Sequence, residues 1–517
     1  MSLPNIAQMS VEELTKLNPA LAALLSQKDN AIKHKDLKIA QLTHEMATLK
    51  RWTFGKRSEQ VEGLQRSLLE ESIDEDLAAI AVELEQLRAA PTPAAERPKG
   101  IPKRAALPKE LPRIEIRHEP DSTVCGCGCE LKRIGEDVSE KLDFIPGLLQ
   151  VQRHIRGKWV CEQCETLVQA PVPPQVIDKG IPTAGLVAQV MVAKYADHQP
   201  LYRQEEGFGR SGFPIPRSTQ GQWVGAGGVK LTPLYGLMKS LLLKRSVLHA
   251  DETPVPMLKP GLKRTHRAYL WAYGTTQYDP EPMVVYDFAE GRGGEHARKF
   301  LGDGKGALVC DDYTGYDALF RQGVTEVGCM AHARRKFHHL LENEKSAIAA
   351  EALALYGELY GVEREAQELK LNDADRRDLR QRKAKPIAEA LHAWLERQLA
   401  RVPEGSATAK AILYSLRRWP ALTRYLDDGN LPIDNNWVEN RIRPIALGRS
   451  NWLFAGSARA GQRAAIVMSL IQSARLNGHD PYKYLRDVLE RLPLTPEHRL
   501  EELLPHVWKP ADTGRVH

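Results

Sequence analysis

The chain has no hydrophobic segment approaching the roughly 20 apolar residues that a membrane-spanning helix needs. Its first residues, MSLPNIAQMSVEEL, do not place an apolar core after a basic region, so we expect no secretion signal. These two absences predict a cytoplasmic protein without a membrane partner. At 517 residues the chain exceeds the roughly 250–300 residues that a single core sustains, so we expect several domains.

Cysteines are few, and five of the seven stand in two short clusters. The clusters are CGCGC, with Cys125, Cys127 and Cys129, and CEQC, with Cys161 and Cys164. In a reducing cytoplasm such clusters indicate a metal site and not disulfides. We predict a structural Zn²⁺ bound by Cys125, Cys127, Cys161 and Cys164, with Cys129 as an alternative ligand. Reduced cysteines in a small core are the competing interpretation.

The excess of positive charge is modest. A formal net charge of +6 is compatible with a nucleic-acid partner but does not establish one. Basic residues and prolines concentrate in the stretch APTPAAERPKGIPKRAALPKELP. Because proline fixes φ and removes a backbone donor, we predict an extended linker over residues 91–113.

Apolar residues recur every seven positions near the N-terminus. The a positions are Leu25, Ile32, Ile39 and Met46, the later d positions are Leu42 and Leu49, and Lys28 and Lys35 fill the two earlier d positions. This pattern predicts a coiled coil within a helical oligomerisation region, residues 1–90. The alternative is an amphipathic helix that packs on its own protein.

From residue 246 onwards the hydrophobic periodicity changes. SVLHAD, RAYLWAYGTT and PMVVYDFA are expected as three strands in a meander, followed by a helix, the strand GALVCD, a helix and the strand VTEVGCM. A long helical stretch follows. We predict a zinc module at 114–170, a helical region at 171–245, a catalytic domain at 246–475 with a helical insertion at about 340–430, and a helical tail at 476–517. PIPRSTQGQWV could open a DNA-reading helix-turn-helix within 171–245, with an ordinary helical hairpin as the alternative.

Three acidic residues stand out by their positions. Asp251 and Asp311 end predicted strands, and Glu439 lies in a short helical stretch beyond the insertion. Carboxylates repel one another, so their usual reason to gather is a divalent cation. Each aspartate has an acidic neighbour, Glu252 or Asp312, and spacing alone does not choose within each pair because successive strand residues face opposite ways.

Glu439 lies in the stretch DNNWVENRIRPIALGRSNW. Taken alone, it would pair with Arg443 four residues on, as on any exposed helix. Pro444 is expected to end or kink that helix near Arg443. If Glu439 is instead a metal ligand, Asn435 would steady its carboxylate or contact DNA. Three arginines would then form a positive wall beside a phosphate: Arg441, Arg443 and Arg449.

Seven stretches together resemble the transposases of insertion-sequence family sixty-six, the large, TnpC-like DDE transposases. They are FGKRSE, CGCELKRIGEDVSEKLDFIPG with GKWVCEQC, HADETPVPML, CDDYTGYDAL, GCMAHARRKF, DNNWVENRIRPIALGRSNWLFAGS and HDPYKYLRDVLERLP, and they span about residues 10–510. The resemblance implies an RNase H-like catalytic fold. It also implies that Asp251, Asp311 and Glu439 form the metal-binding triad.

The stretch GCMAHARRKF adds further candidates. Cys329 and His332 could support the active site or DNA, and a packed cysteine with a supporting histidine is the other interpretation. The basic cluster Arg334, Arg335 and Lys336 is a candidate phosphate contact, with a solvated helix face as its alternative.

We therefore expect a multidomain α/β protein with an N-terminal coiled coil, a zinc module and an RNase H-like domain that carries a helical insertion. Its expected function is to bind the terminal inverted repeats of an insertion sequence and to cut and join double-stranded DNA. Two Mg²⁺ ions, for which Mn²⁺ could substitute, would serve the reaction. A homo-oligomer, accessory proteins of the same element and a place at the bacterial nucleoid are also expected. The alternatives are an inactive or domesticated DNA-binding protein and a nuclease that cuts without joining.

Overall fold

The computed structural model describes residues 11–54, 63–88, 107, 109, 111–120, 122–145, 148–172, 174–177, 180–259, 265–452 and 454–511. Side chains are described within these ranges except for residues 11–25, 51–70 and 145. Most of the predicted linker and of the stretch FGKRSE therefore lies outside the described residues. None of the described helices is long and apolar enough to cross a membrane.

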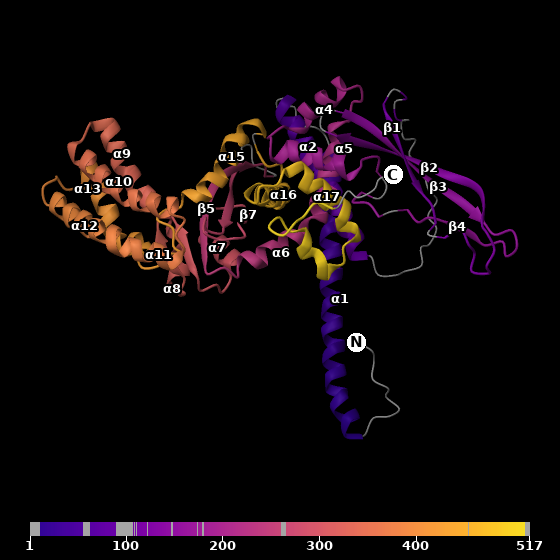
Figure 1. Ribbon diagram of the computed structural model, residues 1–517, viewed down its shortest axis with the longest axis horizontal. Coiled ribbons are helices and arrows are strands. Elements are labelled where there is room, and N and C mark those ends of the chain that lie inside the picture. The colour runs from indigo at the N-terminus through magenta and orange to yellow at the C-terminus, as the bar shows by residue number, and fades with distance from the viewer. Residues whose placement is uncertain are drawn as a thin grey trace.

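A five-stranded mixed sheet forms the centre of the molecule (Figure 1). Its strands are β5 (Val247–Met257), β6 (His266–Gly274), β7 (Val284–Ala289), β8 (Ala307–Cys310) and β9 (Thr325–Gly328). The spatial order is β7-β6-β5-β8-β9, in which β5, β6 and β7 are antiparallel while β8 and β9 run parallel to β5. Helices α7 (Gly294–Leu301) and α8 (Asp317–Arg321) make the two crossovers. The predicted order of three strands, helix, strand, helix and strand is confirmed.

The predicted end of the first strand of the central sheet is wrong. The strand was expected to end at Asp251, but β5 continues to Met257 because it pairs with β6 from His249 to Met257. The parallel pairing of β5 with β8 does stop early, at His249 opposite Val309. Asp251 therefore lies just beyond the point where β5 and β8 separate, although it is inside a strand.

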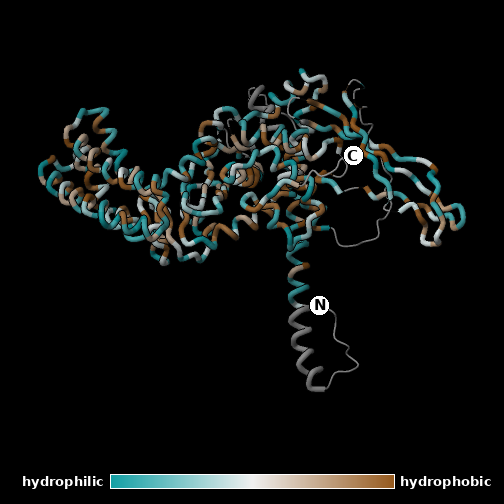
Figure 2. Tube along the Cα trace, in the orientation of Figure 1, coloured by the Kyte–Doolittle hydropathy of each residue, from teal (hydrophilic) through white to brown (hydrophobic). Residues whose placement is uncertain are grey.

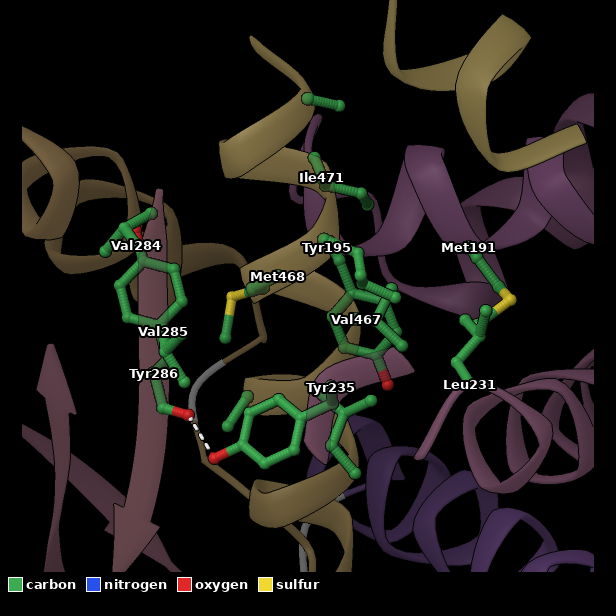
Figure 3. Packing of buried hydrophobic residues seen from close by; sticks show 14 of the residues in the cluster. Met191, Tyr195, Leu231, Tyr235, Val284, Val285, Tyr286, Val467, Met468 and Ile471 are labelled. Atoms are coloured by element: carbon green, nitrogen blue, oxygen red, sulfur yellow. Dashed lines mark hydrogen bonds between the residues drawn. The ribbon is translucent and has the colours of Figure 1, made fainter. Parts of the chain in front are cut away.

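The outer edge of β7 is covered by side chains of α16 (Ala458–Leu476). The backbone N–H groups of Val284 and Tyr286 donate to the hydroxyls of Ser473 at 3.0 Å and Ser469 at 2.8 Å. Tyr235 donates its hydroxyl to the Tyr286 carbonyl at 2.9 Å (Figure 3). An exposed strand edge is a template for pairing with another chain, and here a helix satisfies it. Apolar residues concentrate around this contact (Figure 2).

Helices before and after the sheet complete the central body. They are α3 (Ala184–Tyr195), α4 (Leu201–Arg210), α5 (Arg217–Lys230), α6 (Thr232–Leu242) and α17 (Pro481–Arg491). The region was predicted to be helical, and it is. Most of α5, including Trp223 and Gly225, is buried. A DNA-reading role for α5 stays a prediction.

The helical insertion forms a second core at one end of the molecule (Figure 1). It comprises α9 (Met330–Glu344), α10 (Ala347–Glu368), α11 (Asp373–Leu379), the π-helix η3 (Arg380–Ala384), α12 (Lys385–Leu399), α13 (Ala407–Arg417) and α14 (Trp419–Thr423). The insertion leads into α15 (Asn436–Trp452). Short 3₁₀ helices lie at Thr314–Tyr316, Arg424–Leu426, Leu492–Leu494 and Glu497–Leu503.

A second sheet lies at the opposite end of the molecule (Figure 1). It consists of β1 (Arg113–His118), β2 (Lys132–Ile145), β3 (Leu148–Val160) and β4 (Leu167–Gln169). Strands β2 and β3 form a long antiparallel ribbon, with β1 parallel to β3 on its other side and β4 at the end of β3. A small zinc module was expected here, but these strands were not predicted.

The N-terminal helices form a hairpin of α1 (Val11–Phe54) and α2 (Gly63–Arg88). In the second half of the heptad pattern, Leu42 is fully buried against Ile80 and Leu84 of α2. Ile32, in the first half, is 56% exposed. The second half of the pattern therefore packs within the chain, as the alternative interpretation proposed. Oligomerisation through the first half stays a prediction.

Buried ion pairs fix α2 to the body. The Glu75 carboxylate is 2% exposed and pairs with Lys194 at 2.6 Å and with Arg463 at 2.8 Å. Burial would raise the pKa of Glu75, but these two cations lower it by more, so the pKa lies below its usual value. Gly225 of α5 allows the close approach, because a Cβ there would lie 2.2 Å from the Glu75 carbonyl oxygen.

We predict that Glu75→Ala lowers the free energy of unfolding by about 3–5 kcal/mol, since it leaves Lys194 without its buried partner and Arg463 with Asp76 alone. Urea denaturation followed by circular dichroism measures this. Glu502→Ala, which removes an exposed carboxylate paired with Arg499, should leave the transition where it is. Equal effects of the two substitutions would show that the α2 contact does not stabilise the body.

Candidate active site and metal centres

The three predicted acids come from separate elements. Asp251 lies on β5, Asp311 follows the last residue of β8, and Glu439 lies in the first turn of α15. Burial raises the pKa of Asp251 well above its usual value. The neighbouring carboxylates of Glu252, Glu439 and Asp311 raise it further. The structure thus brings the three acids close enough to repel one another.

Glu252, the neighbour of Asp251, already has partners. Its Oε1 accepts a hydrogen bond from Nε of Arg292 at 2.7 Å, and its Oε2 accepts one from the Tyr316 hydroxyl at 3.1 Å. Asp251 instead accepts the backbone N–H of Glu252 at 2.9 Å. Within the described part of the chain, Asp251 has no ion-pair partner, so its carboxylate is available to a cation.

Asp311 and Asp312, the second pair of adjacent acids, also differ in their ion-pair partners. Asp312 is 59% exposed and forms an ion pair with Arg418. Asp311 accepts the backbone N–H of Tyr313 at 3.0 Å and has no ion-pair partner among the described residues, and both acids line the same cleft. Arg292 and Arg418 could not be identified from the sequence, because an arginine remote in sequence carries no signal of the acid that it will neutralise.

Glu439 faces α9 and not the outer face of its own helix. Its Oε2 accepts a hydrogen bond from Nη2 of Arg335 at 3.2 Å, and its Oε1 lies 3.6 Å from Nδ1 of His332. Arg443 is exposed and makes no ion pair with Glu439 among the described contacts. The alternative of a Glu439–Arg443 surface pair is therefore wrong.

The helix does not end at Pro444. Helix α15 runs from Asn436 to Trp452 with this proline inside it. A proline removes one helical N–H and crowds the preceding turn. Burial of Val438, Ile442 and Ile445 holds the helix together despite that loss, and Tyr286 donates its hydroxyl to the Arg441 carbonyl at 2.8 Å.

Asn435 is fully buried, so the prediction that it contacts DNA is wrong. Its Nδ2 donates to the carbonyl of Ala250 at 2.9 Å, and its Oδ1 lies 2.7 Å from Nδ1 of His249. Its own carbonyl accepts the backbone N–H of Glu439 at 3.2 Å. Burial lowers the pKa of His249 to about 4, so this imidazole is neutral. Asn435 therefore connects β5 to the start of α15.

Two of the three arginines on α15 have structural partners. Arg449 donates to the carbonyl of Pro254 on β5 at 2.7 Å. The Arg441 guanidinium lies over the Trp437 ring, 4.2 Å from its centre. Arg443 is the one of the three that is exposed. A DNA-contacting role for Arg441 and Arg449, which are both half-buried, stays a prediction, as it does for Arg443.

An open cleft with a volume of ≈ 560 Å³ lies beside Asp311. Its lining comprises residues that directly follow β8, residues of α9, Arg292 from the segment between β7 and α7, and Tyr414 of α13: Arg292, Asp311, Asp312, Tyr313, Thr314, His332, Arg335, Lys336, His339 and Tyr414. Lys336 places its Nζ 4.2 Å from the centre of the Tyr414 ring. Arg334 is exposed but lies outside this lining.

A second cluster lies at the far end of the β2–β3 ribbon. The sulfur atoms of Cys125, Cys127, Cys161 and Cys164 all lie within 4.8 Å of one another. The distances include 3.2 Å from Cys125 to Cys164 and 3.7 Å from Cys127 to Cys161. Sulfurs around a tetrahedral zinc are about 3.8 Å apart, given Zn–S bonds of about 2.3 Å. These four residues can therefore hold Zn²⁺.

Cys129, the alternative ligand, lies outside this cluster. Its thiol donates to Oε1 of Gln163 at 2.9 Å. Within the cluster, hydrogen bonds from Thr166 and then Cys125 lower the pKa of the Cys164 thiol to about 6.

We predict that Cys161→Ser lowers the zinc content of the purified protein by one ion per chain, because three thiolates remain of a four-ligand site. Cys129→Ser should leave the zinc content unchanged. Metal analysis by plasma mass spectrometry on both variants measures this. A loss of zinc from the Cys129 variant would mean that CGCGC uses a different pair of ligands.

Family models match both the region that carries the three acids and the region that carries the cysteine cluster. The family described as "Transposase IS66 family" matches residues 179–463, and "IS66 C-terminal element" matches residues 469–506. The "zinc-finger binding domain of transposase IS66" matches residues 122–165, which include the four clustered cysteines. "Transposase C of IS166 homeodomain" matches residues 41–116.

Similar proteins cover most of the chain. The uncharacterized protein y4jD of Sinorhizobium fredii is 38% identical over 426 residues, which are 79% of this chain and 83% of that protein. The uncharacterized protein y4qI of the same organism is 35% identical over 513 residues, which are 96% and 94% of the two chains. These matches define a DNA-binding transposase with a zinc-binding module. The chain belongs to the IS66 family of insertion-sequence transposases.

Proposed function

We propose that the protein is a DDE transposase, in which Asp251, Asp311 and Glu439 are the catalytic acids of an RNase H-like domain. The observation that carries the proposal is the difference in ion pairing between the two aspartates and their acidic neighbours. Glu252 and Asp312 are neutralised by arginines, whereas the charges of Asp251 and Asp311 have no such partner among the described residues. The strand order β7-β6-β5-β8-β9 supports an RNase H-like fold.

The donor set fits Mg²⁺. Carboxylate oxygens are the ligands that this cation prefers. Oε1 of Glu439 is buried and accepts no hydrogen bond within the described chain, so it is free to bind a cation. Two such ions, when bound, would activate a water or a 3′-hydroxyl and stabilise the leaving oxygen of a phosphodiester.

The basic residues around the cleft would bind the DNA backbone. Arg335 forms an ion pair with Glu439, and a cation bound by Glu439 would release this guanidinium toward a phosphate in the cleft. Lys336 lines the same cleft, and Arg443 lies one helical turn beyond Glu439 on the exposed face of α15. The protein would thereby place a scissile phosphate beside the acids.

The remaining regions would hold the two ends of the element. In this proposal residues 1–90 join copies of the chain, while the zinc module at 114–170 and the helices at 171–245 contribute to binding the terminal inverted repeats. Phosphate contacts would supply much of the affinity. Joining two ends requires at least two copies of the protein, and accessory proteins of the same element could take part.

We predict that Asp251→Asn, Asp311→Asn and Glu439→Gln each lower Mg²⁺-dependent joining of a labelled element end to target DNA by at least about a hundredfold. Glu252→Gln and Asp312→Asn are matched controls, since each removes an adjacent charge that an arginine already neutralises. They should retain joining. The products are separated on a sequencing gel, which resolves joined from merely hydrolysed DNA.

The outcome also separates the alternatives. Full joining by Asp251→Asn would exclude it from the triad, and a wild-type chain that binds ends without nicking them would be an inactive relative. A chain that nicks ends without joining them would be a nuclease.

We predict that Arg335→Ala reduces the slope of log affinity against log salt concentration for DNA by about one unit, because one phosphate contact is lost. In the absence of DNA, the same variant should bind Mn²⁺ more tightly, because a competing cation no longer occupies Glu439. Fluorescence anisotropy and electron paramagnetic resonance measure the two effects. Arg377→Ala, in the helical insertion, is the control of equal charge, and a wild-type salt slope for Arg335→Ala would exclude it from the interface.

A further inference from the structure

A cysteine, a histidine and Glu439 form a group of possible metal ligands next to the two aspartates. Cys329, His332 and Glu439 each offer a ligand atom within 4.8 Å of the other two. Cys329 immediately precedes α9, His332 is in the first turn of that helix, and Glu439 is in the first turn of α15. The start of α9 and the start of α15 therefore meet at this point.

Two polar atoms in this group lack partners. Nδ1 of His332 and Oε1 of Glu439 are both buried, and neither makes a hydrogen bond within the described chain. They lie 3.6 Å apart, too far for a hydrogen bond of usual length. A cation between them satisfies both, since nitrogen and oxygen ligands of a tetrahedral zinc are about 3.3 Å apart. The pair is thus a near-fit for a shared metal ion.

Cys329 supplies the third ligand. Its side chain is 1% exposed, and its sulfur accepts the backbone N–H of Asn435 at 3.1 Å. Such an N–H···S bond stabilises a thiolate and leaves other sulfur lone pairs for a metal. Asn435 is itself fixed by its bonds to Ala250 and His249, so the sulfur is held at a defined place.

The ligand types select the metal. A sulfur, an imidazole nitrogen and a carboxylate oxygen suit Zn²⁺ and related cations, whereas Mg²⁺ prefers oxygen alone. Three protein ligands leave a fourth position open, which a water or a phosphate oxygen could fill. This distinguishes the group from the Cys₄ cluster, whose four sulfurs leave no open position.

We propose that Cys329, His332 and Glu439 form a second site for a thiophilic divalent cation of the zinc type, separate from the Cys₄ site. On binding, the thiol proton of Cys329 passes to solvent. The cation then occupies Glu439, so that this carboxylate no longer serves Mg²⁺. The site itself rests on geometry alone, while its inhibitory consequence rests on the proposed function.

The test is the zinc content of the full-length protein after saturation with Zn²⁺ and removal of weakly bound metal. Native mass spectrometry should find two ions per chain in the wild type and one in Cys329→Ser and in His332→Gln. Cys129→Ser and His339→Gln are the matched controls and should retain two ions. One ion in the wild type, or two in Cys329→Ser, would overturn the proposal. Circular dichroism confirms that the variants are folded, and His332→Gln tests the site without altering the buried thiol.

A second experiment tests whether Zn²⁺ bound at this site inhibits DNA joining. In Mg²⁺-dependent joining assays, added Zn²⁺ should inhibit the wild type and leave His332→Gln resistant by at least about tenfold in concentration. If joining is absent from all proteins while the zinc counts follow the prediction, the proposed function fails and the site stands. If the wild type joins DNA and binds one ion only, the site fails and the function stands.

Discussion

The bonds of one buried amide hold the candidate active site together. Asn435 bonds to the Ala250 carbonyl and contacts His249 on β5, and its own carbonyl binds the first turn of α15. Asp251 follows Ala250 by one residue, and Glu439 follows Asn435 by four. Their separation is therefore fixed by a few hydrogen bonds between segments 185 residues apart in the chain. Since an unpaired buried amide is costly, the two elements can separate only at a substantial free-energy cost.

Much of the central architecture could be predicted, because local sequence and final environment agree there. The β-branched and aromatic segments that follow residue 246 became strands of the central sheet, and the Ala- and Leu-rich stretch became the helical insertion. The four cysteines also meet as their spacing suggested. The β2–β3 ribbon was missed because KRIGEDVSEKLDFI carries charged residues along much of its length, without the alternation that marks a half-buried strand.

The details of the site depended on contacts that no local pattern encodes. Choosing Asp251 over Glu252 required the position of Arg292, which lies 40 residues from Glu252 in the chain. The burial of Asn435 and the internal role of Arg449 follow from how α15 packs on β5. Pro444 was expected to interrupt a helix on local grounds, and tertiary packing overrode that preference. Residue type thus indicated a metal-binding, polyanion-binding site, while packing decided which side chains face it.

The ion pairs of Glu75 have a consequence for the order in which the protein can fold. Arg463, one of its two cationic partners, lies 388 residues later in the chain. At about 5–20 residues per second, a ribosome needs roughly 20–80 s to make the sequence between them. Until then α2 lacks the partner that completes its buried charge cluster. The contact of α2 with the body is therefore completed only after α16 is made, and a chain truncated before α16 leaves Glu75 without one of its two cationic partners.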